Sequence, residues 1–341
     1  MNTFIHSLMT FIDLMALSSV VGTVLCLHWT MCPVCVGEES LANPCFDRCR
    51  RLLLYCLAGL SSSSIGILVQ RSMEMAGLGI TEITPVLPTV LFSSHYGSMW
   101  LLRAGSVMVA WGVWWLGRRR LASGLVIAIL LSACVAIAFS RSASSHAADY
   151  GDLSLQQLSD WFHLIAAVAW GGALISMALM LSVSDVANSA EQQHIVAGMA
   201  GKFYALFGPL FAVLVASGLY NSWVEVRSFS ALLSTTYGLF LSAKLLIFAY
   251  LTSRYIAPPQ RGKDEAAYAL EFVRRTRVEA LLILAILLSV SLFTHEIPAR
   301  HAAHMMMQHE HKMDSNPEKS PDHDMSHKME QSHGMKHGSG M

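Results

Sequence analysis

Long runs of apolar residues, separated by short polar segments, repeat along the 341-residue chain. They occupy about residues 3–28, 52–71, 98–116, 121–140, 158–182, 204–223, 236–256 and 277–295. Most of these runs approach or exceed the roughly 20 residues that a helix needs to cross a bilayer. The pattern predicts an all-α, polytopic membrane protein, with a bundle of about eight transmembrane helices within residues 1–298.

Composition supports this class of protein. Hydrophobic residues make up 54% of the chain and charged residues only 13%, against about a quarter charged in a typical soluble protein. The formal net charge of +0 gives no reason to expect nucleic acid as a partner. Residues 1–47 contain no Lys or Arg, so the first run lacks the basic start of a cleaved signal peptide and is expected to remain as a helix.

The basic residues concentrate in alternate loops, the first, third, fifth and seventh. These loops carry Arg48, Arg50, Arg51, Arg118, Arg119, Arg120, Lys202, Arg254, Arg261, Lys263, Arg274, Arg275 and Arg277. Because Lys and Arg favour cytoplasmic loops, these four loops are predicted to face the cytoplasm. With eight spans, both termini then lie outside, in a periplasm or its equivalent.

Five histidines fall at the predicted outer ends of the spans: His6, His95, His146, His163 and His295. Two of them, His6 and His163, lie inside apolar runs, where an ionisable group is costly unless it has a partner or a function. All five are therefore candidate metal ligands, with His163 as the leading one. Asp149, Asp152 and Asp160 are available nearby as acceptors that could orient an imidazole.

Two charged residues stand deep in apolar runs, Asp13 in the first and Lys244 in the seventh. Intramembrane charges commonly pair with each other, so a buried Asp13–Lys244 pair is the simpler interpretation. The alternative is that both residues mark a path for an ion or a proton.

The first cytoplasmic loop, residues 29–51, is rich in cysteine. Cys32, Cys35, Cys45 and Cys49 form two close pairs, a grouping that suits a soft metal such as Cu(I) or Zn(II). Two disulfides, if the topology were inverted, and inert thiols are the alternatives.

Residues 299–341 change character and predict a disordered, metal-binding tail. Imidazoles and thioethers are interleaved along it, and this mixture favours copper, as Cu(I), Cu(II) or both, over zinc or nickel. The candidate ligands are His301, His304, Met305, Met306, Met307, His309, His311, His323, Met325, His327, Met329, His333, Met335 and His337.

The chain resembles the copper resistance protein D family of bacterial inner-membrane proteins. The resemblance rests on His146, on the segment DWFHLIAAVAWGG that contains His163, on YGLFLSAK ending at Lys244, and on SSHYGSMWLLR ending at Arg103. It covers about residues 85–295, and the cysteine-rich loop and the tail look like additions. The resemblance implies an eight-helix bundle in copper handling, commonly uptake into the cytoplasm with a periplasmic copper-binding partner.

Together these features predict an inner-membrane copper protein that is not an enzyme and has copper and membrane lipid as its partners. Copper would pass from the tail to the outer histidines, then past Asp13 and Lys244 to the thiolates, in the direction of rising Cu(I) affinity. No ATP-binding motif is present in the sequence. Two alternatives stay open: a haem-bearing redox protein such as a cupric reductase, and a copper sequestration or sensing protein that does not transport.

Overall fold

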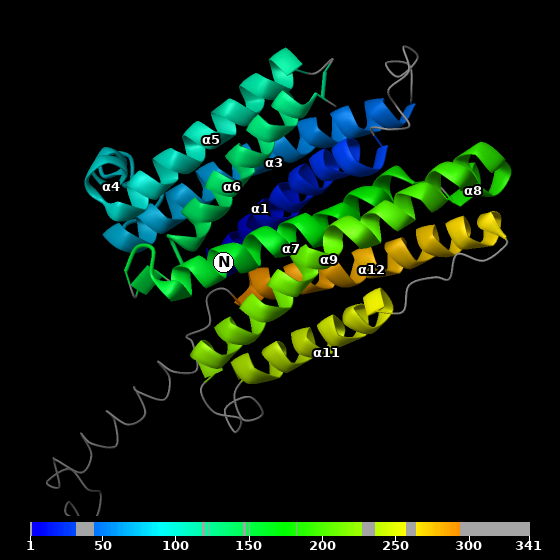
Figure 1. Ribbon diagram of the computed structural model, residues 1–341. Helices are drawn as coiled ribbons and strands as arrows, with labels where there is room; N and C mark the ends of the chain where they lie inside the picture. Colours follow the sequence, from blue (N-terminus) through cyan, green and yellow to red (C-terminus); the bar gives the residue numbers. More distant parts are fainter. Residues whose placement is uncertain are drawn as a thin grey trace, which may run out of the picture.

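The computed structural model describes residues 2–31, 44–117, 120–121, 123–145, 148–149, 151–181, 183–226, 236–256 and 264–293. Within these residues the regular structure is helical (Figure 1). The long helices are α1 (Asn2–Leu25), α3 (Pro44–Ala76), α5 (His95–Gly117), α6 (Gly124–Ser142), α7 (Leu155–Met180), α9 (Ala190–Val226), α11 (Thr236–Ile256) and α12 (Glu265–Phe293). Short elements are the π-helix η1 (Cys26–Met31), α4 (Leu87–Ser93) and α8 (Val183–Asn188).

The predicted apolar runs coincide with these long helices. In the described residues, five of them are long and apolar enough to cross a membrane: α1, α3, α5, α6 and α7. A sixth candidate is α9, which contains Pro209 and bends by 41° between Gln192–Ala205 and Gly208–Val224. The all-α membrane class is thus confirmed, while the crossing of a membrane by α11 and α12 stays a prediction.

The core is built around α1, which lies between α3 and α7 (Figure 1). Helices α1 and α7 approach each other so closely at Gly22 that no larger residue fits there. A Cβ added to Gly22 would lie 2.0 Å from the carbonyl carbon of Gly172. Small residues permit such backbone contacts between membrane helices. The glycines therefore fix how α1 and α7 pack, and with them the positions of the polar side chains on both helices.

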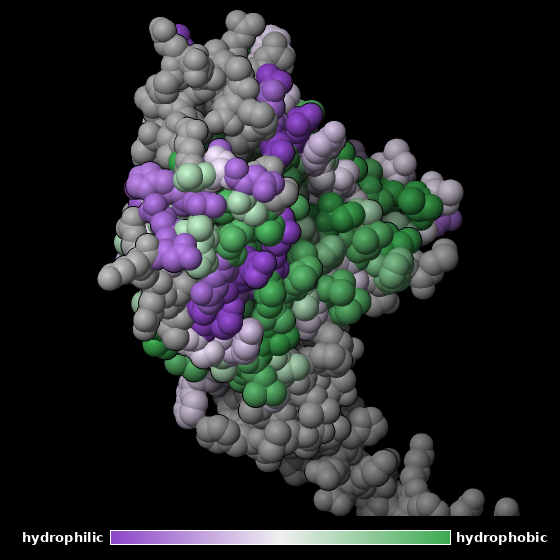
Figure 2. Space-filling model, turned by 90° about the vertical axis from the view of Figure 1, so that its right-hand side faces the viewer, coloured by the Kyte–Doolittle hydropathy of each residue, from purple (hydrophilic) through white to green (hydrophobic). Residues whose placement is uncertain are grey.

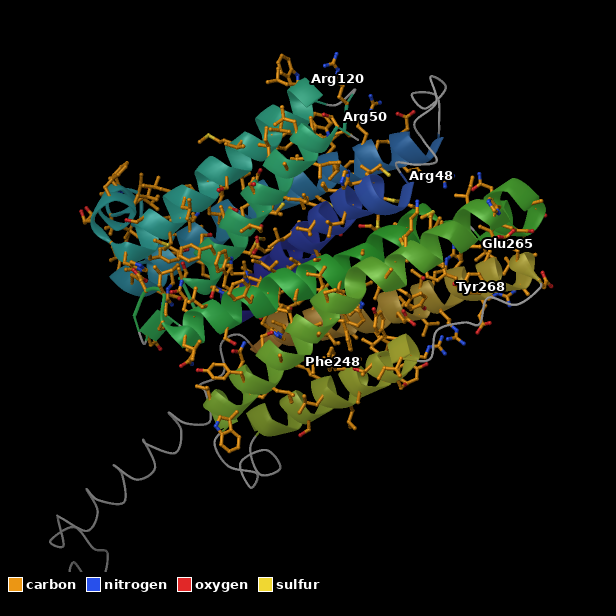
Figure 3. All side chains as sticks on the ribbon, in the orientation of Figure 1. Arg48, Arg50, Arg120, Phe248, Glu265 and Tyr268 are labelled. Atoms are coloured by element: carbon orange, nitrogen blue, oxygen red, sulfur yellow. The ribbon has the colours of Figure 1, made fainter. Side chains whose placement is uncertain are left out.

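The chain crosses the bundle back and forth, so helix ends gather at two opposite ends of the molecule. Arg48, Arg50, Arg120 and Glu265 lie at the end where α3 and α12 begin (Figure 3). Figure 2 looks onto this end, and hydrophilic residues gather in its middle beside hydrophobic ones. The basic loops expected in the cytoplasm are attached to helices at this end, and we call it the basic end; which side of the membrane it faces stays a prediction.

Candidate functional site

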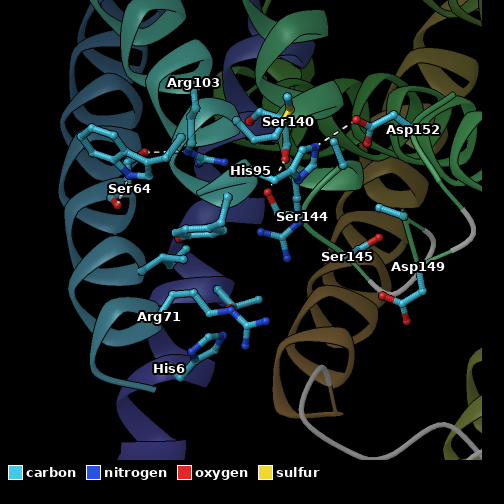
Figure 4. Close-up of a pocket in the computed structure, with 18 of the residues that line it drawn as sticks. His6, Ser64, Arg71, His95, Arg103, Ser140, Ser144, Ser145, Asp149 and Asp152 are labelled. Carbon is cyan, nitrogen blue, oxygen red and sulfur yellow. Dashed lines mark hydrogen bonds and ion pairs between the residues drawn. The ribbon is translucent and has the colours of Figure 1, made fainter. Parts of the chain in front are cut away.

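The opposite end of the bundle contains a pocket of about 750 Å³. Helices α1, α3, α5 and α6 and the segment before α7 form its wall (Figure 4). Imidazole, thioether, carboxylate and guanidinium groups line this wall. They belong to His6 and His95, to Met99, to Asp149 and Asp152, and to Arg71, Arg103 and Arg141. Hydroxyl groups of Thr10, Ser64, Ser140, Ser144 and Ser145 complete its polar lining.

Asp13 lies behind this pocket and is fully buried. Its carboxylate accepts hydrogen bonds from Arg103, from Arg141 at 2.8 Å and from the hydroxyl of Ser63 at 2.9 Å. Arg103 also donates through Nε to Ser64 Oγ at 2.7 Å. This network connects α1, α3, α5 and α6, and it places two guanidinium groups at the pocket.

The predicted pairing of Asp13 with Lys244 is therefore wrong. Lys244 is on α11, which packs against α12 on the far side of α7 from α3 and α5 (Figure 1). The sequence showed the deep carboxylate but not its partners, because Arg141 stands at the end of an apolar run and resembled a loop cation. Whether Asp13 and Lys244 belong to a transport path is a prediction that the structure does not test.

His95 is the first residue of α5 and is oriented by two local interactions. Ser94 Oγ accepts a hydrogen bond from the amide of Gly97 at 2.9 Å, as a helix cap does. A Cβ on Gly97 would lie 2.2 Å from the carbonyl oxygen of Val90, so α4 and α5 meet at a corner that only glycine allows. This corner holds His95 at the pocket wall.

The imidazole of His95 is 3.0 Å, through Nε2, from the carboxylate of Asp152 (Figure 4). A carboxylate bound to one ring nitrogen is the usual way to orient a metal-binding histidine, which then coordinates through the other nitrogen. Met99 lies one turn further along α5, on the same face as His95 and in the same pocket wall. Met99 was not among the predicted ligands, although its spacing from His95 was visible in the sequence.

His6 contributes to the same pocket from α1 and is 12% exposed. Its Nδ1 is 4.0 Å from the carboxylate of Glu74, which also pairs with Arg71 at 3.0 Å. The structure therefore brings together two of the predicted ligands, His6 and His95, in one cavity.

His163 lies outside the pocket lining, between α7 and α9. Its Nδ1 is 3.1 Å from the hydroxyl of Ser217, and its ring packs on Gly218, where a Cβ would come within 3.0 Å of Cε1. The start of α7 is fixed by Ser154, whose side chain accepts from the amide of Gln157. His163 is thus separated from His95 and His6, and its role as a metal ligand stays a prediction.

Trp170, two turns after His163, packs against Phe211 and Phe248, with ring centroids 5.3 and 6.3 Å away. These contacts join α7 to α9 and α11. Among the described residues, Trp170 therefore packs these three helices together through aromatic contacts.

Several predicted ligands lie outside the described residues. They are His146, His295, Cys32, Cys35 and every candidate in residues 299–341; Cys45 lies in α3, but its side chain is not described. Cys49 is described and is buried inside the bundle rather than in a loop. In the described part of the chain, no group of three or more His, Cys, Asp or Glu side chains could hold a metal ion.

Comparisons with known proteins agree with the chemistry of these residues. The model of the copper resistance protein D-like N-terminal domain matches residues 1–155, and the model of copper resistance protein D matches residues 197–293. The N-terminal match includes residues 1–84, which the resemblance from sequence motifs did not cover. The tail lies beyond both matches.

A relative from Pseudomonas syringae pv. tomato, copper resistance protein D, is 26% identical over 233 residues, which is 65% of this chain and 72% of that protein. No solved structure matches the chain significantly. Together the two family models cover well over half of the chain. Family membership implies a role in copper resistance, and this chain belongs to the copper resistance protein D family.

Proposed function

We propose that this membrane protein takes up copper, moving it from the periplasm across the bacterial inner membrane into the cytoplasm as part of copper resistance or homeostasis. The observation that carries the proposal is the pocket at the end opposite the basic end, where His6, His95 and Met99 share one cavity. If the basic end is cytoplasmic, this pocket opens to the periplasm. Copper is the cargo, and no catalytic reaction is assigned.

The pocket offers the ligands that copper accepts. Imidazole binds both Cu(I) and Cu(II), and thioether selects Cu(I). His95, oriented by Asp152, supplies its Nδ1, and Met99 supplies its sulfur from the next turn of the same helix. His6 faces the same cavity from α1, so the proposed copper ligands come from two helices.

The pocket also limits where copper can go. Arg103 and Arg141 line it beside the buried Asp13, and their guanidinium groups repel a cation at this depth. Asp149 and Asp152, by contrast, attract a cation to the rim. We therefore propose that copper binds at the rim, and that its inward movement requires the Asp13 network to open.

The tail and a periplasmic copper-binding protein complete the proposal as sources of copper. The His and Met residues of 299–341 would collect copper at the periplasmic face. Deleting residues 299–341 should then lower uptake only when copper is scarce. Equal losses at scarce and abundant copper would contradict a role for the tail in collection.

Copper accumulation in cells tests the proposed function. Cells producing the wild-type chain, the double variant His95→Ala/Met99→Leu and the control His194→Ala are compared at equal amounts of protein in the membrane. His194 is an exposed histidine that pairs with Glu265 at the basic end. We expect the double variant to lose most of the protein-dependent accumulation, about tenfold, and the control to keep it.

The outcomes separate transport from its alternatives. Accumulation equal to that of cells without the protein, in the wild type and in both variants, would contradict transport and favour sequestration. More copper in cells with the double variant than in cells with the wild type would indicate export. A haem absorption band in the purified wild-type protein would replace the proposal with a redox function.

A further inference from the structure

Helices α1 and α3 run antiparallel in a register that several contacts define. Gly66 of α3 faces Met9, Ser63 bonds Asp13, and Gly59 faces Ala16. Following the same register further along both helices brings Cys26, directly after α1, opposite Cys49 of α3. Both residues are fully buried thiols.

Helix α7 supplies a third sulfur at the same place. The thiol of Cys49 lies 3.4 Å from the sulfur of Met180, which is 3% exposed. Cys26 donates from its thiol to the carbonyl of Ala173 at 3.8 Å, and Met177 lies one turn beyond Ala173, with no exposed surface. Sulfur-bearing side chains from η1, α3 and α7 therefore lie in the same part of the core, toward the basic end.

Two further features distinguish this place from ordinary core packing. The chain changes from α-helix to π-helix at Cys26, in η1, and π-helical turns often occur at functional sites. The side chain of Arg48 donates to the carbonyl oxygen of Met180 at 3.3 Å, which brings a positive charge to the backbone of the residue that carries one of the sulfur atoms. A monovalent cation bound by two thiolates forms a complex with a net negative charge. This guanidinium group would stabilise that charge.

We propose that Cys26, Cys49 and Met180 form a Cu(I) site inside the bundle at its basic end. The proposal rests on the proposed function for its metal, and it places the inner copper site in the core instead of in the cysteine-rich loop. Thiolate and thioether ligands together select Cu(I), whereas Zn(II) prefers four thiolate or imidazole ligands. On binding, Cu(I) forms bonds to both cysteine sulfurs and to Met180, two thiol protons leave to solvent, and copper keeps its oxidation state.

The site gives copper a second environment along α1. The pocket at the other end of the helix offers imidazole and thioether in an open, polar cavity. The sulfur site offers thiolates in a closed, apolar one. Copper that reaches it is held more tightly than at the pocket, which favours its transfer from the pocket to the sulfur site.

Cu(I) retention by the purified full-length protein tests the site. The protein is loaded with Cu(I) without oxygen and then treated with bathocuproine disulfonate, a chelator that competes better with imidazole and thioether ligands than with thiolates. The variants are Cys26→Ser, Cys49→Ser and Met180→Leu. The matched control is Cys134→Ser, which changes another buried thiol, on α6, and a Cys32→Ser/Cys35→Ser variant accounts for the loop.

We expect one retained copper to disappear in Cys26→Ser and in Cys49→Ser, and to remain in Cys134→Ser and in the loop variant. Met180→Leu, which conserves volume, should weaken retention about tenfold. X-ray absorption of the retained copper should show sulfur neighbours only. Equal retention in the wild type, Cys26→Ser and Cys49→Ser, or loss in the loop variant alone, would overturn the proposal.

The result is distinguishable from the uptake experiment. If His95→Ala/Met99→Leu keeps full uptake while the two cysteine variants lose the retained copper, the sulfur site stands and the proposed role of the pocket fails. If Cys49→Ser does not fold, Cys26→Ser and Met180→Leu still decide the question, because these two changes remove ligands from other helices. Unfolding midpoints of all variants without copper provide that check.

Discussion

The two halves of α1 have different surroundings, and the half that leads to Cys26 is the more deeply buried one. In the half that begins at the pocket, Ser7, Thr10 and Asp13 are buried polar residues, and Asp13 joins α1 to three other helices through ionic hydrogen bonds. In the half that ends at Leu25, directly before Cys26, the helix packs closely on α7 through Gly22. The first half is held by an ionic network, and the second by close backbone contact and by a hydrogen bond between the hydroxyls of Thr23 and Ser176 at 3.1 Å.

This difference shows that burial alone does not identify a site. Both halves contain fully buried side chains, such as Asp13 and Thr23, yet the chemistry that each half could offer a metal is set by its neighbours. Around the pocket the neighbours are imidazoles, carboxylates and guanidinium groups; at the other end they are sulfur atoms. The contrast supports the proposed path, along which copper would meet progressively softer ligands.

Replacing Asp13 with Ala should have the largest effect. The change leaves the guanidinium groups of Arg103 and Arg141 buried without their shared carboxylate, and removing one partner of a buried pair costs about 3–5 kcal/mol. The purified variant should unfold at a clearly lower denaturant concentration or temperature than the wild type. Ser63→Ala, which removes one neutral donor to the same carboxylate, should cost about 1 kcal/mol.

An unfolding midpoint of Asp13→Ala equal to that of Ser63→Ala would contradict the contrast drawn between the two halves of α1. It would mean that the polar half of α1 does not depend on its ionic network. Measuring both variants in the same detergent removes differences in solvent.

Gly22→Ala should disturb the other half of α1. The new methyl group would overlap the backbone of α7 at Gly172, and overpacking of this kind costs about 1–3 kcal/mol. Gly105→Ala on α5 is the matched control, since no atom lies within 4 Å of its added Cβ. The control should be neutral or slightly stabilising, because alanine favours a helix over glycine by about 1 kcal/mol.

Thermal unfolding of the two glycine variants measures this difference directly. Equal midpoints for Gly22→Ala and Gly105→Ala would mean that α1 and α7 are not in backbone contact. The packing that closes the sulfur site would then need another explanation.

Asp152→Asn should weaken copper binding at the pocket without lowering stability. The amide no longer carries the charge that orients His95 and makes it a better ligand, and such a change typically costs 10–100-fold in metal affinity. Copper titration against a competing chelator measures the loss. Asp47→Asn, which alters an exposed pair with Arg50 at the basic end, should bind copper as the wild type does.

His163→Ala should have the smallest effect on the pocket. His163 contacts Ser217 and Gly218 instead of the pocket, so its loss should cost about 1 kcal/mol of stability and leave pocket affinity unchanged. The same titration compares it with His95→Ala. A loss of affinity as large as that of His95→Ala would instead support the prediction that His163 is a copper ligand.

Sequence periodicity predicted the helices well. Apolar runs of bilayer length have few alternatives to a helix, because every backbone group in a membrane must be paired within its own segment. The basic loops were also visible in the sequence, and the helix ends to which they are attached lie at the same end of the bundle (Figure 3). His6 and His95 could be selected as candidates because imidazoles at the ends of apolar runs are rare and costly.

The partners of these residues could not be predicted in the same way. Asp13 was matched with Lys244 because both charges stand in apolar runs, yet the fold places Arg103 and Arg141 against the carboxylate. The choice among three cations depends on which helices neighbour α1, and periodicity carries no information about helix order. Cys49 shows the same limit, since its spacing from Cys45 suggested a loop site while α3 starts early enough to place it in the core.

The sequence by itself determined the class of the protein, the approximate bounds of its helices, the family resemblance and the types of ligand available. Only the tertiary structure decided that His95 meets Asp152, that His163 meets Ser217 and that Cys49 meets Met180. The reason is physical: helix formation in an apolar run follows from local composition. The grouping of side chains from separate helices follows from how those helices pack, which small residues such as Gly22 and Gly172 set over long sequence distances.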